Sequence, residues 1–287
     1  MKLSLNLFFA AKKIGYEKAI NLSADAGFDA LDMGFFDMKT GESPFCADNY
    51  KEVCDSLLSL AKSRGMCFNQ AHAPFGSPYV KYFAESVPHF PRAFECCARL
   101  GVGTLVIHPV QDGQFYLHES EMLEKSVKFY KELIPMAREY GVRIATENMW
   151  QRDARGYVVD DTCASPEHFC AVVDSVDSEW LTACLDIGHI VLCGRDPYTF
   201  IHKLGRERLT ALHIHDNDLT FDAHAAPFQG KIDWSGVCRA LREIGYSGDF
   251  TYEVDRVLKS TPEAVYPSML KHLERVGRYL ISEIENI

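Results

Sequence analysis

The stretch "LTALHIHDND", residues 209–218, decides how the chain is interpreted. Its first part is apolar and typical of a buried β-strand, and its second part is a cluster of ionisable side chains. Polar groups at the end of a buried strand lose hydration, so they need partners. Other strands that end in the same way could supply those partners.

Eight apolar runs have strand character, and amphipathic helical stretches separate them. The runs are "KLSLNLFF" (2–9), "ALDMGF" (30–35), "MCFNQAHA" (66–73), "TLVIHP" (104–109), "RIATEN" (143–148), "LTACLDIGH" (181–189), "LTALHIHD" (209–216) and "DFTYEV" (249–254). Glycines that precede strands indicate helix C-caps at Gly27, Gly65, Gly101 and Gly141. Strict strand–helix alternation predicts a parallel sheet, and eight units predict a (β/α)8 TIM barrel, one α/β domain over residues 1–287. No G-x-G-x-x-G follows a strand, so a dinucleotide-binding sheet is the weaker alternative.

The composition narrows the class of partner. The formal net charge is −10, and no long Lys/Arg run is present. We therefore expect neither a nucleic-acid nor a membrane partner. The ten cysteines form no C-x-x-C pair and predict reduced thiols in a cytoplasmic protein. The apolar N-terminal stretch stops at Lys12 and Lys13, which favours a first strand and loop over a signal peptide.

Ionisable residues gather near the carboxyl ends of the predicted strands, where TIM barrels build their active sites. Carboxylates that converge there repel one another, and a divalent cation relieves the repulsion. A set of three carboxylates and one imidazole suits Mn²⁺, Co²⁺, Mg²⁺ or Zn²⁺. By strand alternation, His213 lies one layer below His215. The predicted metal ligands are Glu147, Asp186, His215 and Glu253.

Several motifs then occur in one order along the chain. They are "HAPFG" (72–76), "ATEN" (145–148), "LDIGH" (185–189), "HIHDND" (213–218), "GKID" (230–233) and "YEV" (252–254). In this order the chain resembles the xylose isomerase-like TIM barrel superfamily, in its sugar phosphate isomerase/epimerase branch, which is related to endonuclease IV. The resemblance implies a single-metal site on the same four ligands, and it selects His215 because "HDND" is similar to the family's His-x-Asn-Asp.

The resemblance also implies a reaction. A metal-dependent isomerase or epimerase of a sugar or sugar-like polyol moves a proton through a metal-bound enediolate. Glu147 and Glu253 would carry the proton, and His189 would hydrogen-bond a substrate oxygen. Relatives that are ketose 3-epimerases have an arginine six residues after the strand-7 histidine, where this chain has Phe221. This difference puts the function of a simple ketose 3-epimerase in doubt. Whether the chain forms a homo-oligomer is left open.

Two alternatives remain. With His189 and the four ligands above, His72, His108, Asp222 and His224 match by motif order the nine ligands of the three-zinc site of endonuclease IV. That match implies an alternative function, hydrolysis of phosphodiesters in abasic DNA, with those four residues as additional metal ligands or substrate contacts. Few basic residues lie in the strand-end loops, which argues against a DNA backbone. The second alternative is a sugar-binding or partner subunit without turnover.

Aromatic residues at or just beyond strand ends complete the predicted pocket. An aromatic ring can pack against the apolar face of a sugar. The expected pocket residues are Phe8, Phe35, Phe75 and Trp150.

Overall fold

The structure is a computed structural model that describes residues 1–286, apart from the side chains of Tyr82, Phe83 and Asp255. The barrel strands are β1 (Leu3–Asn6), β2 (Ala30–Gly34), β3 (Cys67–His72), β4 (Thr104–Val106), β5 (Arg143–Glu147), β8 (Leu181–Asp186), β9 (Leu209–His213) and β10 (Phe250–Tyr252). A hairpin is formed by β6 (Trp150–Arg152) and β7 (Val158–Asp160). The helices are α1 (Phe8–Ile14), α2 (Tyr16–Ala26), α3 (Tyr50–Ser63), α4 (Lys81–Ala84), α5 (Phe90–Leu100), α6 (Phe115–Tyr140), α7 (Pro166–Val176), α8 (Ile187–Leu192), α9 (Pro197–Leu204), α10 (Trp234–Glu243), α11 (Asp255–Ser260) and α12 (Tyr266–Glu285).

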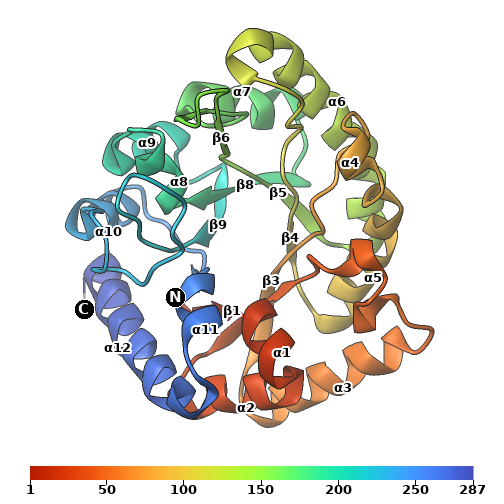
Figure 1. Cartoon of the computed structure of the whole chain (residues 1–287), viewed down its shortest axis with the longest axis vertical. Coiled ribbons are helices and arrows are strands. Elements are labelled where there is room, and N and C mark those ends of the chain that lie inside the picture. The colour runs from red at the N-terminus through yellow and green to blue at the C-terminus, as the bar shows by residue number, and fades with distance from the viewer. Residues whose placement is uncertain (287) are drawn as a thin grey trace.

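The predicted (β/α)8 barrel is confirmed. Within residues 1–286, eight parallel strands pair in the order β10-β1-β2-β3-β4-β5-β8-β9, and helices surround them (Figure 1). A parallel bridge between Ile214 and Tyr252 joins the two ends of this sheet. There Ile214 N donates to Thr251 O at 2.9 Å, and Glu253 N donates to Ile214 O at 3.1 Å. The carboxyl ends of all these strands therefore form one rim.

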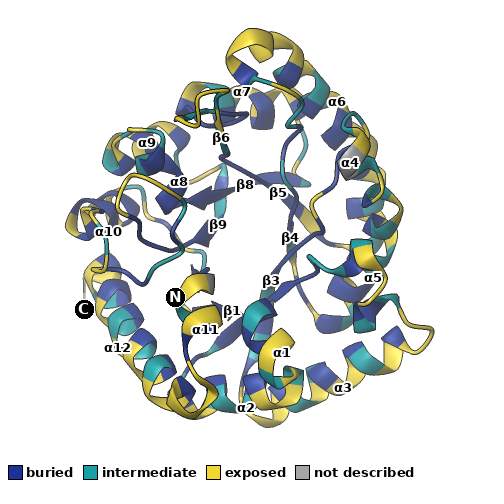
Figure 2. Ribbon diagram, viewed as in Figure 1, coloured by how far each residue is buried: buried dark blue, intermediate teal, exposed yellow. Residues whose placement is uncertain are grey.

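Apolar side chains fill two regions. Large residues such as Phe94 and Phe169 pack between the strands and the outer helices, and most residues of the barrel strands are buried (Figure 2). A separate cluster of small residues comprises Val106, Ala145, Cys184 and Ala211. Polar side chains also lie inside the barrel below the rim, where Ser4 Oγ donates to Asn69 Oδ1 at 2.7 Å and Asn69 Nδ2 donates to Thr251 Oγ1 at 3.2 Å.

Strand ends differ from the prediction where a polar side chain stops the strand. The first strand was predicted to reach residue 9, yet β1 ends at Asn6 and α1 starts at Phe8. Asn6 Oδ1 accepts a hydrogen bond from Phe8 N at 3.0 Å, while Asn6 Nδ2 donates to Asp32 Oδ2 at 2.9 Å. One buried amide thus ends the strand and starts the helix.

The predicted glycine caps agree with the backbone. Gly27, Gly65, Gly101 and Gly141 all have positive φ, between 67° and 102°. These are conformations that residues with a side chain rarely adopt. In the described part of the chain all ten cysteines are free thiols. None of the helices within residues 1–286 has the length and apolarity needed to cross a membrane.

Candidate metal centre and active site

Side chains from the strand ends and following loops meet at the barrel rim in three adjoining groups. In each group one potential ligand atom per residue lies within 4.8 Å of the others. The central group is Glu147, Asp186, His213 and Glu253; the second is His72, His108 and Glu147; the third is His189, His215, Asp222 and His224. Glu147 belongs to both the central and the second group. The structure therefore gathers every metal ligand predicted from the sequence, together with His213.

The two histidines of "HIHDND" keep the predicted order of layers but belong to different groups. His213 pairs in register with Asp186 across β8 and β9, so these two residues lie at one height. His213 Nδ1 lies 3.1 Å from Glu147 Oε1 and 3.2 Å from Glu253 Oε2. His215 lies one alternation step closer to the solvent, where its ring stacks on His224 at 4.2 Å. Alternation identified the correct face, but the register of β9 assigns His213, rather than His215, to the central group.

Asp186 has two roles because its two oxygens face different partners. Oδ1 accepts a hydrogen bond from His189 N at 2.7 Å and so caps α8. Oδ2 lies 3.0 Å from His215 Nε2. Asn148, which the sequence analysis did not select, accepts from Asp186 N at 2.8 Å and donates to Asp186 O at 2.9 Å. This amide fixes the ends of β5 and β8 relative to each other.

Three histidines are oriented by backbone carbonyl groups. Nδ1 of His72 donates to Ala73 O at 2.7 Å, that of His189 to Asn148 O at 2.8 Å, and that of His224 to Glu253 O at 2.9 Å. In a neutral ring, a donating Nδ1 leaves the Nε2 lone pair available to the rim. The raised pKa of His189 favours the protonated ring, in which Nε2 also donates. Metal-binding histidines are commonly held in this way.

Carboxylates and imidazoles at the rim shift one another's pKa values toward the charged forms. Burial acts to raise the pKa of Glu147, but His213, His108 and His72 outweigh it and hold the pKa well below its ordinary value. Burial acts to lower the pKa of His189, but Asp186 and Asp222 raise it well above its ordinary value. These carboxylates are therefore ionised and surrounded by nitrogen donors.

Several buried atoms of the rim have no hydrogen-bond partner among the described residues. They are Glu147 Oε2, His213 Nε2, His215 Nδ1 and Asp222 Oδ1. Glu147 Oε2 lies 3.2 Å from His108 Nε2, and the Nε2 atoms of His72 and His108 are 3.0 Å apart. Unsatisfied buried acceptors are costly, and a divalent cation satisfies oxygen and nitrogen lone pairs together. The donor set therefore fits a metal ion.

Close approach explains the glycines in two of the motifs. A Cβ atom on Gly188 of "LDIGH" would lie 2.0 Å from His215 Cε1. A Cβ on Gly230 of "GKID" would lie 2.2 Å from both Asn217 O and Asp216 Oδ1. Asp216 itself is fully buried and accepts from Phe228 N at 3.0 Å and from Trp234 Nε1 at 2.9 Å. It holds together the loop after β9, which carries Asp222 and His224.

Two of the four predicted pocket aromatics face the rim. The Phe75 ring lies 4.8 Å from that of His108, and Trp150 Nε1 donates to Asp222 Oδ2 at 3.4 Å. Phe35 was predicted to line the pocket, but it is fully buried in the core against Phe45. Phe8 was predicted there too, but it is 7% exposed and packs against Phe36.

Phe36 and Phe9 occupy the pocket positions that were predicted for Phe35 and Phe8. Phe36 lies 4.7 Å from the His72 ring, and Phe9 lines a cavity beside His224. The chain turns out of β2 after Gly34, and α1 begins at Phe8. The prediction relied on side-chain alternation along extended strands, and this alternation ends at both points. The sequence therefore gave no signal that Phe9 and Phe36, rather than Phe8 and Phe35, lie toward the rim.

Comparison with known proteins agrees with this architecture. Residues 20–276 match the family model of the xylose isomerase-like TIM barrel. The chain belongs to this family. The match covers most of the barrel, including every residue of the three rim groups.

Individual members of the xylose isomerase-like family are distant relatives. The chain is 30% identical over 190 residues to an uncharacterised protein of Methanocaldococcus jannaschii, covering 63% of this chain and 62% of that protein. It is 28% identical over 178 residues to the inosose isomerase of Bacillus subtilis, covering 60% of this chain and 61% of that protein. The chain thus spans less than two thirds of the length of both relatives.

Solved structures share the whole barrel. A D-tagatose 3-epimerase-like protein superposes with a TM-score of 0.76 at 23% identity, covering 100% of this chain and 99% of that one. The IOLI protein, solved with a binding zinc atom, superposes with a TM-score of 0.78 at 21% identity, covering 99% of both chains. At these identities the likeness establishes the fold.

Proposed function

We propose that the protein is a metal-dependent isomerase or epimerase of a sugar or sugar-like polyol. The observation that carries the proposal is the central group, in which two glutamates approach one histidine nitrogen from β5 and β10. The relatives named as an inosose isomerase and a D-tagatose 3-epimerase-like protein support the same class. We propose Glu147, Asp186, His213 and Glu253 as the residues that hold the ion.

A bound divalent metal would supply Lewis acidity, which makes the C–H next to a substrate carbonyl more acidic. Glu147 and Glu253 are the two carboxylates that can accept and return that proton. The pKa of Glu147 lies well below its ordinary value, because His213 and His108 outweigh burial, so this carboxylate is ionised in the folded protein. His189, held by Asn148 O, can donate to a substrate oxygen.

Solvent deuterium tests this function. Turnover of the correct sugar in D₂O should place one deuterium on a substrate carbon, read by mass spectrometry. Glu253→Gln removes a proton carrier at nearly unchanged size, and we expect exchange to fall at least about 100-fold. Glu243→Gln is the matched control, because Glu243 is exposed and pairs with His202 on the outer helices. No deuterium in any compound of a broad sugar and inosose panel would contradict the proposal.

The second candidate is endonuclease IV-like hydrolysis of abasic DNA. The specific observation in its favour is that the second and third groups adjoin the central one, so that the rim offers more than one cluster of ligands. Several metals suit phosphodiester hydrolysis, because they stabilise attacking and leaving oxygens together. Incubation of zinc-loaded protein with an abasic duplex tests it, and an uncut duplex after long incubation would exclude it.

A further inference from the structure

Three cations gather at the mouth of the barrel above the third group. Arg152 on β6 and Arg256 and Lys259 on α11 line one cavity of about 540 Å³. Asp222 and His224 line the same cavity. All three cations are exposed, and none pairs with a carboxylate that the structure describes. Unpaired positive charges concentrate here although the chain carries a net charge of −10.

Each cation is held against an aromatic ring of the same cavity. Arg152 Cζ lies 5.5 Å from the ring centre of Trp150, and Arg256 Cζ lies 5.0 Å from that of Phe221. Lys259 Nζ lies 5.6 Å from the ring centre of Phe9. These contacts position the cations without neutralising them. Three cation–aromatic pairs, which involve β6, α11, α1 and the loop after β9, therefore line one cavity.

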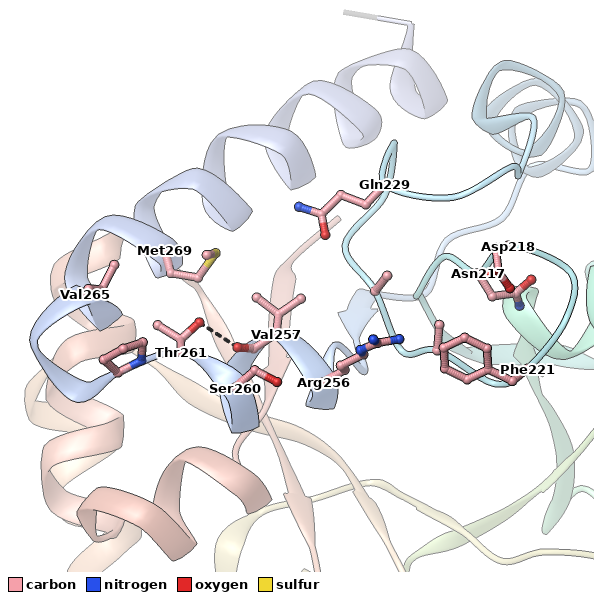
Figure 3. A pocket seen from close by; sticks show the side chains of 13 residues that line it. Asn217, Asp218, Phe221, Gln229, Arg256, Val257, Ser260, Thr261, Val265 and Met269 are labelled. Atoms are coloured by element: carbon pink, nitrogen blue, oxygen red, sulfur yellow. Dashed lines mark hydrogen bonds between the residues drawn. The ribbon is translucent and has the colours of Figure 1, made fainter.

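Of the three cations, Arg256 is the one that lines two cavities. Figure 3 shows its guanidinium directed toward the Phe221 ring, across the gap between the loop after β9 and α11. The same pair also lines a second cavity of about 570 Å³ on the α12 side. Arg256 thus lines both cavities.

We propose that Arg152, Arg256 and Lys259 bind an oxyanion of the substrate, a phosphate monoester or a carboxylate. Guanidinium groups match such oxyanions with two parallel hydrogen bonds, and neighbouring cations that repel one another gain from sharing an anion. The remainder of the substrate extends toward His224 and Asp222. The inference rests on the proposed function for the polyol part of the substrate, and it defines that substrate as an anionic polyol.

Calorimetric titration of the zinc-loaded protein tests this with three compounds that lack a reactive carbonyl: sorbitol, sorbitol 6-phosphate and gluconate. We expect one of the two anionic compounds to bind at least about tenfold tighter than sorbitol, and which one does so identifies the oxyanion. Arg256→Gln and Lys259→Gln should each reduce that preference about fivefold, and salt should weaken it. Arg143→Gln is the matched control, because Arg143 is exposed at the opposite end of β5.

Equal affinity for all three compounds, or no measurable binding of any, would overturn the proposal. So would an Arg256→Gln variant that behaves like Arg143→Gln. Tighter binding of an abasic duplex, weakened by Arg256→Gln, would assign the three cations to nucleic acid instead. Deuterium exchange distinguishes this proposal from the proposed function. Exchange without a preference for the anionic compounds would contradict only the oxyanion site. A preference for an anionic compound without exchange would contradict only the isomerase or epimerase function.

Discussion

At the scale of single residues, His213 at the end of β9 and His215 just after it offer the sharpest distinction. His213 contacts Glu147 and Glu253, whereas His215 contacts Asp186 and stacks on His224. Loss of a direct ligand costs more affinity than loss of a neighbour, which typically costs 10–100-fold. We expect His213→Ala to weaken the tightest zinc site at least about 100-fold, and His215→Ala less. Competition with a chelating dye measures both.

The control for these variants is His202→Ala, since His202 pairs with Glu243 at an exposed position. A larger loss in His215→Ala than in His213→Ala would restore His215 as the central ligand and contradict the register argument.

Gly188 allows a second test at this scale. An alanine Cβ would meet His215 Cε1 at 2.0 Å, which no small adjustment relieves. We expect Gly188→Ala to displace the His215 ring, so that fewer metal ions are retained per chain while the barrel still folds. Elemental mass spectrometry measures the number of metal ions per chain, and circular dichroism shows whether the barrel folds. Gly103→Ala is the control, because a Cβ there has no atom within 4 Å. Unchanged metal content in Gly188→Ala would exclude His215 from metal binding.

At the scale of elements, one ion pair joins the last helix to the first two strands. Arg278 of α12 donates to Asp29 Oδ2 at 2.6 Å and to Asp29 Oδ1 at 2.8 Å, and Leu3 N donates to Asp29 Oδ2 at 2.8 Å. Burial acts to raise the pKa of Asp29, but Arg278 and the Leu3 amide outweigh it and lower the pKa. The pair therefore stabilises the fold above the ordinary carboxyl pKa, and this contribution is lost as the pH falls through the lowered value.

We expect Asp29→Asn to reduce the free energy of unfolding by about 1 kcal/mol at pH 7, a modest value because both side chains are more than one third exposed. The difference from the parent protein should shrink toward pH 3, since the parent carboxylate then becomes protonated. Urea unfolding at the two pH values measures it. The same deficit at both pH values would mean that the charge of Asp29 plays no part.

At the scale of the whole molecule, metal binding should stabilise the barrel. The rim groups come from strands throughout the sheet, so an ion that binds them binds only the folded chain. At a free concentration 100 times its dissociation constant, such a ligand contributes about 2.7 kcal/mol. For a domain of this size we expect a rise in Tm of about 5 °C after zinc or manganese is added to chelator-treated protein. Scanning calorimetry measures it.

The His213→Ala variant should show a smaller rise in Tm at the same metal concentration. A rise of equal size in both proteins would place the stabilising ion elsewhere on the chain.

The sequence by itself determined the number of strands, their order and the side of the barrel that carries chemistry. These properties depend on local patterns: apolar runs, helix periodicity, glycine caps and polar strand ends. Glu147, Asp186 and Glu253 could be selected because each lies at the end of a buried strand or directly after it. The family resemblance was readable for the same reason, since its motifs are contiguous.

Only the tertiary structure decided which of His213 and His215 stands beside the glutamates, and which of Phe35 and Phe36 faces the rim. Strand register and the turn after Gly34 determine these, and neither leaves a local mark in the sequence. The wall of Arg152, Arg256 and Lys259 could not be recognised in the sequence, because Arg152 lies about 100 residues before the other two and no pattern links them. Adjacency between distant segments arises when the barrel closes, and closure is a property of the packed chain.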